Sequence, residues 1–91
     1  MARRKIGGPV TELNTEDLNA ITRTGTYVQS SNYWAKRSDN YPRAVAGLLE
    51  VYTGGGFTFQ RYTAYKDFGV YTRSHYGYED AWSPWQRILT E

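Results

Sequence analysis

From near residue 45 almost to the end of the chain, short segments in which apolar and polar residues alternate are separated by turns. Leu49 and Val51 share one face of the first such segment, and in the next segment Phe57 and Phe59 lie opposite Gln60. A period of two residues is typical of β-strands with two different faces. Glycine-rich or polar turns separate the segments. The pattern predicts an antiparallel meander with strands at residues 46–52, 57–63, 70–76 and 85–89.

The N-terminal half shows a different spacing. Leu18 and Ile21, three residues apart, share one face of a predicted short helix whose cap is Asn14 or Thr15. Beyond this helix the chain predicts one strand and one long polar loop, at residues 26–29 and 30–43. We therefore expect a β-rich α+β fold in which a short N-terminal helix packs on a small antiparallel β-meander.

Composition determines what can fill the core of this fold. The 91 residues include nine Tyr, three Trp and three Phe but only thirteen Ile, Leu and Val, so much of the packing must be aromatic. There is no cysteine, hence no disulfide and no thiolate chemistry. No apolar run approaches the roughly 20 residues that cross a bilayer, and residues 1–5 lack the apolar stretch of a signal peptide.

The charge is concentrated at the N-terminus. The net charge is +2, and Arg3, Arg4 and Lys5 supply three of the eleven basic residues, so residues 6–91 hold eight basic residues against nine acidic ones. We expect residues 1–12 to form a basic, flexible arm and residues 13–91 to form one domain. A solvated tail is the preferred interpretation of the arm. Single-stranded nucleic-acid binding through stacked aromatic rings is a weaker alternative.

No catalytic or metal-binding arrangement is visible. His75 is the single histidine, and without cysteine it cannot form a zinc centre. Glu79 and Asp80 are neighbours in a predicted turn, which is a poor geometry for two carboxyl groups that must face one another across a glycosidic bond. Ser74 precedes His75 in a strand, so the two side chains point to opposite faces. We expect a protein that is not an enzyme and that needs no cofactor or metal ion.

Aromatic residues beside hydrogen-bonding residues are the distinctive chemistry that remains. Tyr and Trp faces pack against the C–H patches of sugar rings, while Asn, Asp, Gln and Arg bond the hydroxyl groups. This combination gives the candidate carbohydrate-binding residues Tyr33, Trp34, Tyr65, Asp67, Tyr76 and Tyr78. The alternative is that these tyrosines fill the core and subunit contacts, where Tyr, Trp and Arg are enriched. Trp82 and Trp85 are expected to be structural core residues.

Several motifs occur in a characteristic order over roughly residues 13–89. They are Asp-Leu-Asn at 17–19, Gly-Thr-Tyr at 25–27, Asn-Tyr-Pro at 40–42, Phe-Gln-Arg-Tyr at 59–62 and Trp-Ser-Pro-Trp at 82–85. In this order they resemble the small knob domains near the ends of bacteriophage tail fibres and R-type pyocin fibres. Members of that family often carry Asn-Gly before the Trp motif, whereas this chain has Gly-Tyr-Glu-Asp-Ala at 77–81.

The resemblance implies a function. It implies a homotrimer in the distal part of a fibre on a virion, assembled in the host cytoplasm, which recognises a bacterial surface polysaccharide without catalysis and has no membrane partner. A virion component released by lysis would need no signal peptide. The runner-up hypothesis is a purely structural trimerisation or decoration knob of a virion with no ligand.

Overall fold

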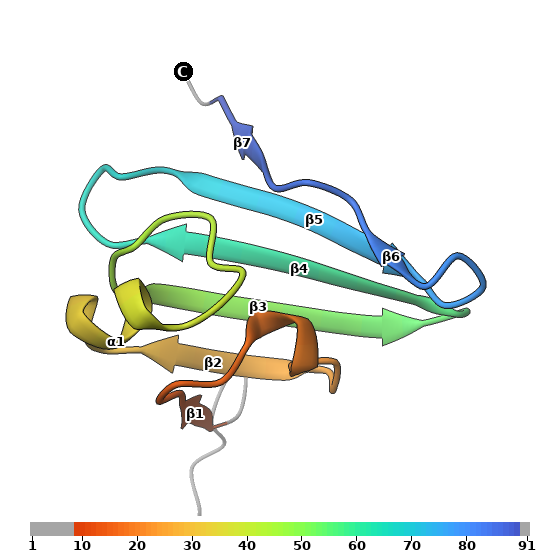
Figure 1. The fold of residues 1–91 in the computed structure, drawn as a ribbon, viewed down its shortest axis with the longest axis horizontal. Coiled ribbons are helices and arrows are strands. Elements are labelled where there is room, and N and C mark those ends of the chain that lie inside the picture. Colours follow the sequence, from red (N-terminus) through yellow and green to blue (C-terminus); the bar gives the residue numbers. More distant parts are fainter. Residues whose placement is uncertain (1–8, 90–91) are drawn as a thin grey trace, which may run out of the picture.

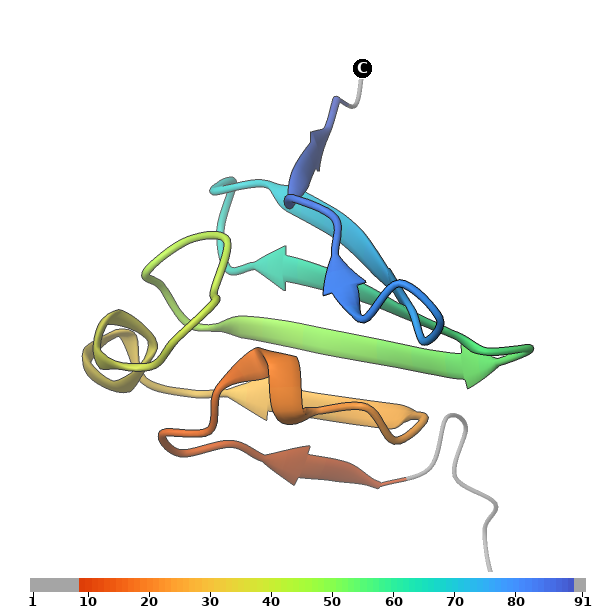
Figure 2. The ribbon, with the colours of Figure 1, turned by 45° about the vertical axis from the view of Figure 1, so that its right-hand side comes forward.

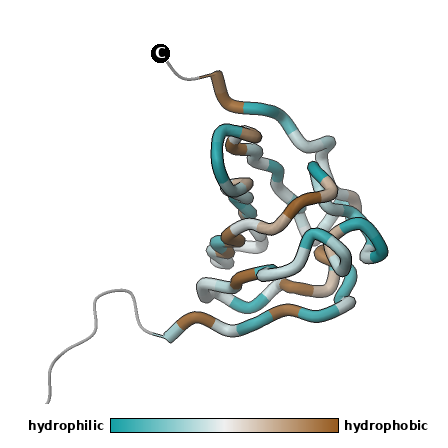
Figure 3. The backbone as a smooth tube through the Cα atoms, turned by 90° about the vertical axis from the view of Figure 1, so that its left-hand side faces the viewer, coloured by the Kyte–Doolittle hydropathy of each residue, from teal (hydrophilic) through white to brown (hydrophobic). Residues whose placement is uncertain are grey.

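Seven strands, one 3₁₀ turn and one short α-helix make up the fold that the computed structural model describes for residues 9–89 (Figure 1). In chain order they are β1 (Val10–Glu12), the 3₁₀ turn η1 (Leu18–Ala20), β2 (Gly25–Gln29), α1 (Asn32–Arg37), β3 (Gly47–Gly54), β4 (Phe57–Ala64), β5 (Val70–Tyr76), β6 (Ala81–Trp82) and β7 (Gln86–Ile88). Within these residues, no helix is long and apolar enough to span a membrane, and Figure 3 shows only short hydrophobic stretches along the chain.

All seven strands belong to one mixed sheet. Its order is β1-β2-β3-β4-β5-β6, with β7 pairing to β5 beside β6. The pairs from β2 onward are antiparallel, but β1 runs parallel to β2. The three long central strands β3, β4 and β5 follow the predicted meander, and the Gly55–Gly56 turn between β3 and β4 has positive φ at both glycines. Arg3, Arg4 and Lys5 of the predicted arm lie outside the described residues, whereas residues 10–12 of that segment form β1.

The predicted fold class was wrong. An α+β domain with an N-terminal helix packed on a purely antiparallel meander was expected, but the predicted helix is only the three-residue turn η1. Acidic side chains accept from backbone N–H groups in and just before this turn: Asp17 Oδ1 from the Asn19 N–H at 2.8 Å, and Glu16 Oε1 from the Asn14 N–H at 2.6 Å. The Leu18 carbonyl accepts from the Ile21 N–H, as in a 3₁₀ turn, and also from Gln60 Nε2 of β4. The molecule is therefore a small β-rich domain.

The predicted polar loop at 30–43 also differs from the structure, since it contains α1. Ser31 caps this helix, with its Oγ accepting from the Trp34 N–H at 3.1 Å. Ala35 is its buried contact with the rest of the protein. The other five residues of this helix are exposed.

One face of the sheet carries the core. Figures 1 and 2 show the η1 segment and the loop between α1 and β3 lying on this face. The buried hydrophobic cluster consists of Leu13, Leu18, Leu49, Val51, Tyr62 and Ala64, with Trp85 among the half-buried residues packed against it. Gln60 is 1% exposed on the same face and joins η1 to the sheet. Among residues 9–89, no segment covers the opposite face in Figures 1 and 2.

Candidate functional site

The outward side of α1 presents two neighbouring aromatic rings. Tyr33 is 54% exposed and Trp34 is 40% exposed. Their ring centroids are 4.7 Å apart in an edge-to-face arrangement. The Arg37 guanidinium lies 3.6 Å from the centroid of the Tyr33 ring, and its Nη1 donates to the Tyr33 carbonyl at 3.2 Å. The Tyr33 ring and the Arg37 side chain therefore hold one another in place on the surface.

A shallow, open hollow lies between α1 and the loop that leads to β3. We call it the α1 cleft; it has a volume of about 440 Å³ and is lined by Asn32, Tyr33, Lys36, Arg37 and Ala44. Asn32 Oδ1 accepts a hydrogen bond from the Ala46 N–H at 2.7 Å and so fixes the distance between the two walls. A cleft with an aromatic wall, an amide and two cations can bind a polar ligand that has ring faces.

The turn between β4 and β5 is tied to the same region. The Ala46 carbonyl accepts from the Tyr65 N–H at 3.1 Å, so α1, the loop and this turn form one hydrogen-bonded unit at one end of the sheet. Tyr65 is 39% exposed, and Asp67 is exposed beside it. The Tyr65 ring packs 5.6 Å from the ring of Phe68.

The structure divides the candidate carbohydrate-binding residues into two groups. Tyr33 and Trp34 lie at the same end of the sheet as Tyr65 and Asp67. Tyr76 and Tyr78 lie at the other end, where β5 turns into β6 (Figure 1). Tyr78 is 89% exposed and its ring centroid is 5.4 Å from that of Tyr76. A single small ligand therefore cannot contact both groups.

Trp82 and Trp85 are both half-buried, and Arg73 lies against both. Its guanidinium carbon is 3.9 Å from the Trp82 ring centroid and 4.5 Å from that of Trp85. The Arg73 Nε donates to Gln60 Oε1 at 2.8 Å. Burial lowers the pKa of Arg73 to about 10, and the nearby Asp17 opposes this shift. Trp85 Nε1 also donates to the Asn40 carbonyl at 2.8 Å. All of these contacts join parts of the chain to one another. That Trp82 and Trp85 are structural core residues stays a prediction.

The open face of the sheet, which we call the aromatic face, carries Tyr52, Phe57, Phe59 and Tyr76. Of these, only Tyr76 was among the candidate residues predicted from the sequence. Tyr52 is 57% exposed, Phe57 38% and Phe59 49%. The Phe57 ring stacks on both Phe59 and Tyr76, at 5.7 and 4.5 Å. The alternation in β4 showed that Phe57 and Phe59 share a face, but the buried face is the one with Gln60 and Tyr62.

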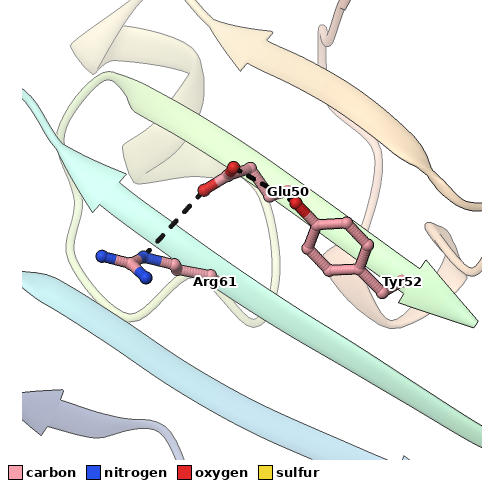
Figure 4. A network of polar contacts seen from close by, with 3 residues as sticks. All are labelled: Glu50, Tyr52 and Arg61. Carbon is pink, nitrogen blue, oxygen red and sulfur yellow. Dashed lines mark hydrogen bonds and ion pairs between the residues drawn. The ribbon is translucent and has the colours of Figure 1, made fainter. Parts of the chain in front are cut away.

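The aromatic face also has a polar network and a hollow. Tyr52 donates to Glu50 Oε2 at 3.4 Å, and Arg61 Nε is 4.0 Å from Glu50 Oε1 (Figure 4). Beside this network is a hollow of about 500 Å³, with Tyr52 and Phe59 among its walls. Ser83, Pro84 and Gln86 line its far side.

Among residues 9–89, no group of three His, Cys, Asp or Glu side chains is placed to hold a metal ion. His75 Nε2 lies 3.5 Å from Asp80 Oδ1, and its ring lies 5.1 Å from the Trp82 ring.

Three solved structures are similar to this chain over almost its whole length. The R2 pyocin fibre of P. aeruginosa is 33% identical with a TM-score of 0.80, and the match covers 98% of this chain and 26% of that one. The R1 pyocin fibre of P. aeruginosa is 30% identical with a TM-score of 0.77, and the match covers 99% of this chain and 25% of that one. An N-truncated R2-type pyocin tail fibre is 28% identical with a TM-score of 0.79, and the match covers 99% of this chain and 35% of that one.

No protein-family model matches the sequence, and a search of curated proteins finds no match. The chain spans between a quarter and about a third of the length of the fibre fragments it matches. The predicted resemblance is confirmed: over almost its whole length the chain is similar to one segment of the R-type pyocin tail fibres.

Proposed function

We propose that this chain is a non-catalytic, receptor-binding domain of a phage or pyocin-type tail fibre, and that its α1 cleft recognises a bacterial surface polysaccharide. The observation that carries this proposal is the pair of exposed rings of Tyr33 and Trp34 beside fixed hydrogen-bonding groups. Exposed aromatic rings that lie together, rather than scattered singly, are typical of interaction surfaces. A fibre domain that is assembled in the host cytoplasm and carried on a virion meets such polysaccharides first.

Rigidity supports the assignment of the cleft. Tyr33 is held by Arg37, α1 is capped by Ser31, and the opposite wall is held by Asn32. Preorganised contacts reduce the entropy that binding loses. The six-residue helix thus presents its rings with little rearrangement.

Glycan binding tests this proposal directly. Bacterial surface polysaccharides on an array should bind the native chain, and Tyr33→Ala with Trp34→Ala should weaken binding at least tenfold. The control is Tyr78→Ala, which removes an exposed ring at the other end of the sheet. Melting temperatures should stay within a few degrees, because Tyr33 and Trp34 are both exposed. Equal binding by the double variant would refute the assignment, and loss through Tyr78→Ala alone would move the site to the other end.

We also propose that the domain is a homotrimer whose subunits meet through the aromatic face. The stacked rings of Phe57, Phe59 and Tyr76 on the open face of the sheet are the specific observation that favours an assembly role. Contiguous exposed apolar surface of this kind marks protein contacts, and aromatic residues are enriched in them. If the glycan test fails and assembly holds, the purely structural alternative is the better one.

Light scattering tests the trimer. The native chain should have a mass near three times its 10.5 kDa, because the rings on the aromatic face are then removed from water. Phe59→Lys should give a monomer, since it would bury a charge in the contact. The matched control, Tyr33→Lys, changes an exposed ring on α1, away from the aromatic face, and should remain trimeric. A native monomer at 100 μM, or a trimer of unchanged stability with Phe59→Lys, would contradict this interface.

A further inference from the structure

Charge is distributed unevenly over the described residues. The α1 end, which we define as residues 31–46 and 65–69, holds four basic residues and two acidic ones: Lys36, Arg37, Arg43, Lys66, Asp39 and Asp67. The remaining described residues hold four basic and six acidic residues. The positive charge of the folded domain is therefore gathered around the α1 cleft, although the two parts together are neutral.

None of these four cations is paired with an acidic residue in residues 9–89. The ion pairs found there join Arg61 to Glu50 and His75 to Asp80. Three of the four cations at the α1 end instead lie over aromatic rings: Arg37 over Tyr33 at 3.6 Å, Arg43 over Phe68 at 5.0 Å and Lys66 over Tyr65 at 5.4 Å. A ring face holds a cation in place without neutralising its charge.

The α1 cleft combines these charges with a ring. Lys36 and Arg37 line it, and Arg43 precedes Ala44, which lines it from the opposite wall. Guanidinium groups bind carboxylate and phosphate through paired N–H donors. A neutral sugar would leave the charges of this cleft without partners, whereas an acidic one would pair with them.

We propose that the ligand of the α1 cleft is an acidic polysaccharide, in which a carboxylate or phosphate group pairs with Arg37 and Lys36 while the sugar ring contacts Tyr33. This rests on the proposed function and names its substrate class. A nucleic-acid strand fits the cleft less well. Base stacking needs free, parallel ring faces along a groove, but Tyr33 and Trp34 meet at 82° and Arg37 covers one face of Tyr33.

The test compares each acidic polysaccharide with its own neutral form. Uronate-containing capsular polysaccharides are paired with their carboxyl-reduced forms, and phosphorylated lipopolysaccharide cores with their dephosphorylated forms. The full chain should bind at least one acidic polymer ten or more times tighter than its neutral form. The pair that shows the preference identifies carboxylate or phosphate as the recognised group.

Matched variants locate the effect. Arg37→Gln should abolish the preference for the acidic form, and Arg37→Lys should keep part of it because the charge remains. Arg23→Gln removes an exposed arginine outside the α1 end and should change nothing. Raising the salt concentration from 50 to 500 mM should weaken binding of the acidic form far more than binding of the neutral form.

Distinct failures have distinct meanings. If acidic and neutral forms bind equally and Tyr33→Ala still weakens both, the acidic ligand is refuted while the proposed function stands. If no polysaccharide binding depends on Tyr33 or Trp34, both are refuted. A single-stranded oligonucleotide that binds as tightly as the acidic polymer, with the same dependence on Arg37, would show a general polyanion surface and would also overturn the inference.

Discussion

Replacement of Gln60 by Leu should have a large effect on stability, because one buried amide serves three partners. Its Nε2 donates to the carbonyls of Leu18 and Ile21 at 2.8 and 2.9 Å, and its Oε1 accepts from Arg73 Nε at 2.8 Å. Gln60 is only 1% exposed, so water cannot replace the amide. Each buried group left without a partner costs about 1–3 kcal/mol.

The sum can be compared with the stability of the whole domain. Without Gln60 the Ile21 carbonyl and the Arg73 Nε–H lose their partners, whereas the Leu18 carbonyl keeps its bond from the Ile21 N–H. Two unpaired groups amount to roughly 2–6 kcal/mol, and a chain of this size has about 5–14 kcal/mol in total. Gln60→Leu should therefore lower the melting temperature by at least about 8 °C, since about 1 kcal/mol corresponds to roughly 4–8 °C in a small domain. Urea unfolding followed by tryptophan fluorescence measures the loss at a fixed protein concentration.

Two further variants make this prediction sharp. Gln86→Leu changes an exposed glutamine and should alter stability by less than about 0.5 kcal/mol. Gln60→Leu combined with Arg73→Met should cost less than the sum of the single changes, because the second removes a donor that the first leaves unpaired. A loss below about 1 kcal/mol for Gln60→Leu, or strict additivity, would refute the role assigned to this amide.

Two other predictions concern backbone packing and pH. Gly47→Ala should destabilise the domain strongly, because a Cβ there would lie 2.6 Å from a backbone carbonyl oxygen and 2.7 Å from the Tyr62 ring. The control is Gly54→Ala, whose Cβ would meet nothing within 4 Å. Melting curves of the two variants test this prediction, and equal melting temperatures would contradict it. Burial raises the pKa of Tyr41 and Tyr62, so their protons are kept in the folded state but lost from the unfolded state above about pH 10. Stability should therefore be constant up to about pH 9 and fall above pH 10. Arg73 acts in the opposite direction, because its pKa is lowered to about 10 in the folded state, and it offsets the contribution of one of the two tyrosines. Urea unfolding at pH 9, 10 and 11 measures this slope, and a flat or rising stability would contradict the prediction.

The central strands could be predicted from the sequence because the pattern that indicates them lies within each strand and its adjoining turns. Alternation and glycine turns placed β3, β4 and β5 within a residue or two of their observed bounds. β1 was missed because its three residues are all exposed and it pairs in parallel with β2, so it leaves no alternating pattern. The open face was missed because alternation separates two faces without showing which one is covered.

The N-terminal helix failed for a tertiary reason. The helical spacing of Leu18 and Ile21 is real, but only Leu18 is fully buried. Gln60, about forty residues further on, binds the carbonyls of both residues. No short-range rule could assign a strand glutamine to these carbonyls. α1 was missed in the same way, since Ala35 is its one buried residue and gives no periodic signal.

The candidate site was partly accessible. Tyr33 and Trp34 stood out as aromatic residues in a polar segment, and the structure leaves both exposed. Their proximity to the turn that carries Tyr65 depends on hydrogen bonds through Ala46, which no sequence pattern indicates. The charge around the cleft was hidden by the basic residues at the N-terminus, which dominate the overall balance.

An NMR titration of the full chain with the acidic polysaccharide that binds it most tightly tests the central claim most directly. The account predicts that shifted backbone amides cluster in α1, in residues 43–46 and in the turn around Tyr65, and that the indole N–H signal of Trp34 shifts while that of Trp85 does not. Shifts confined to the turn between β5 and β6, or spread over the aromatic face, would contradict it.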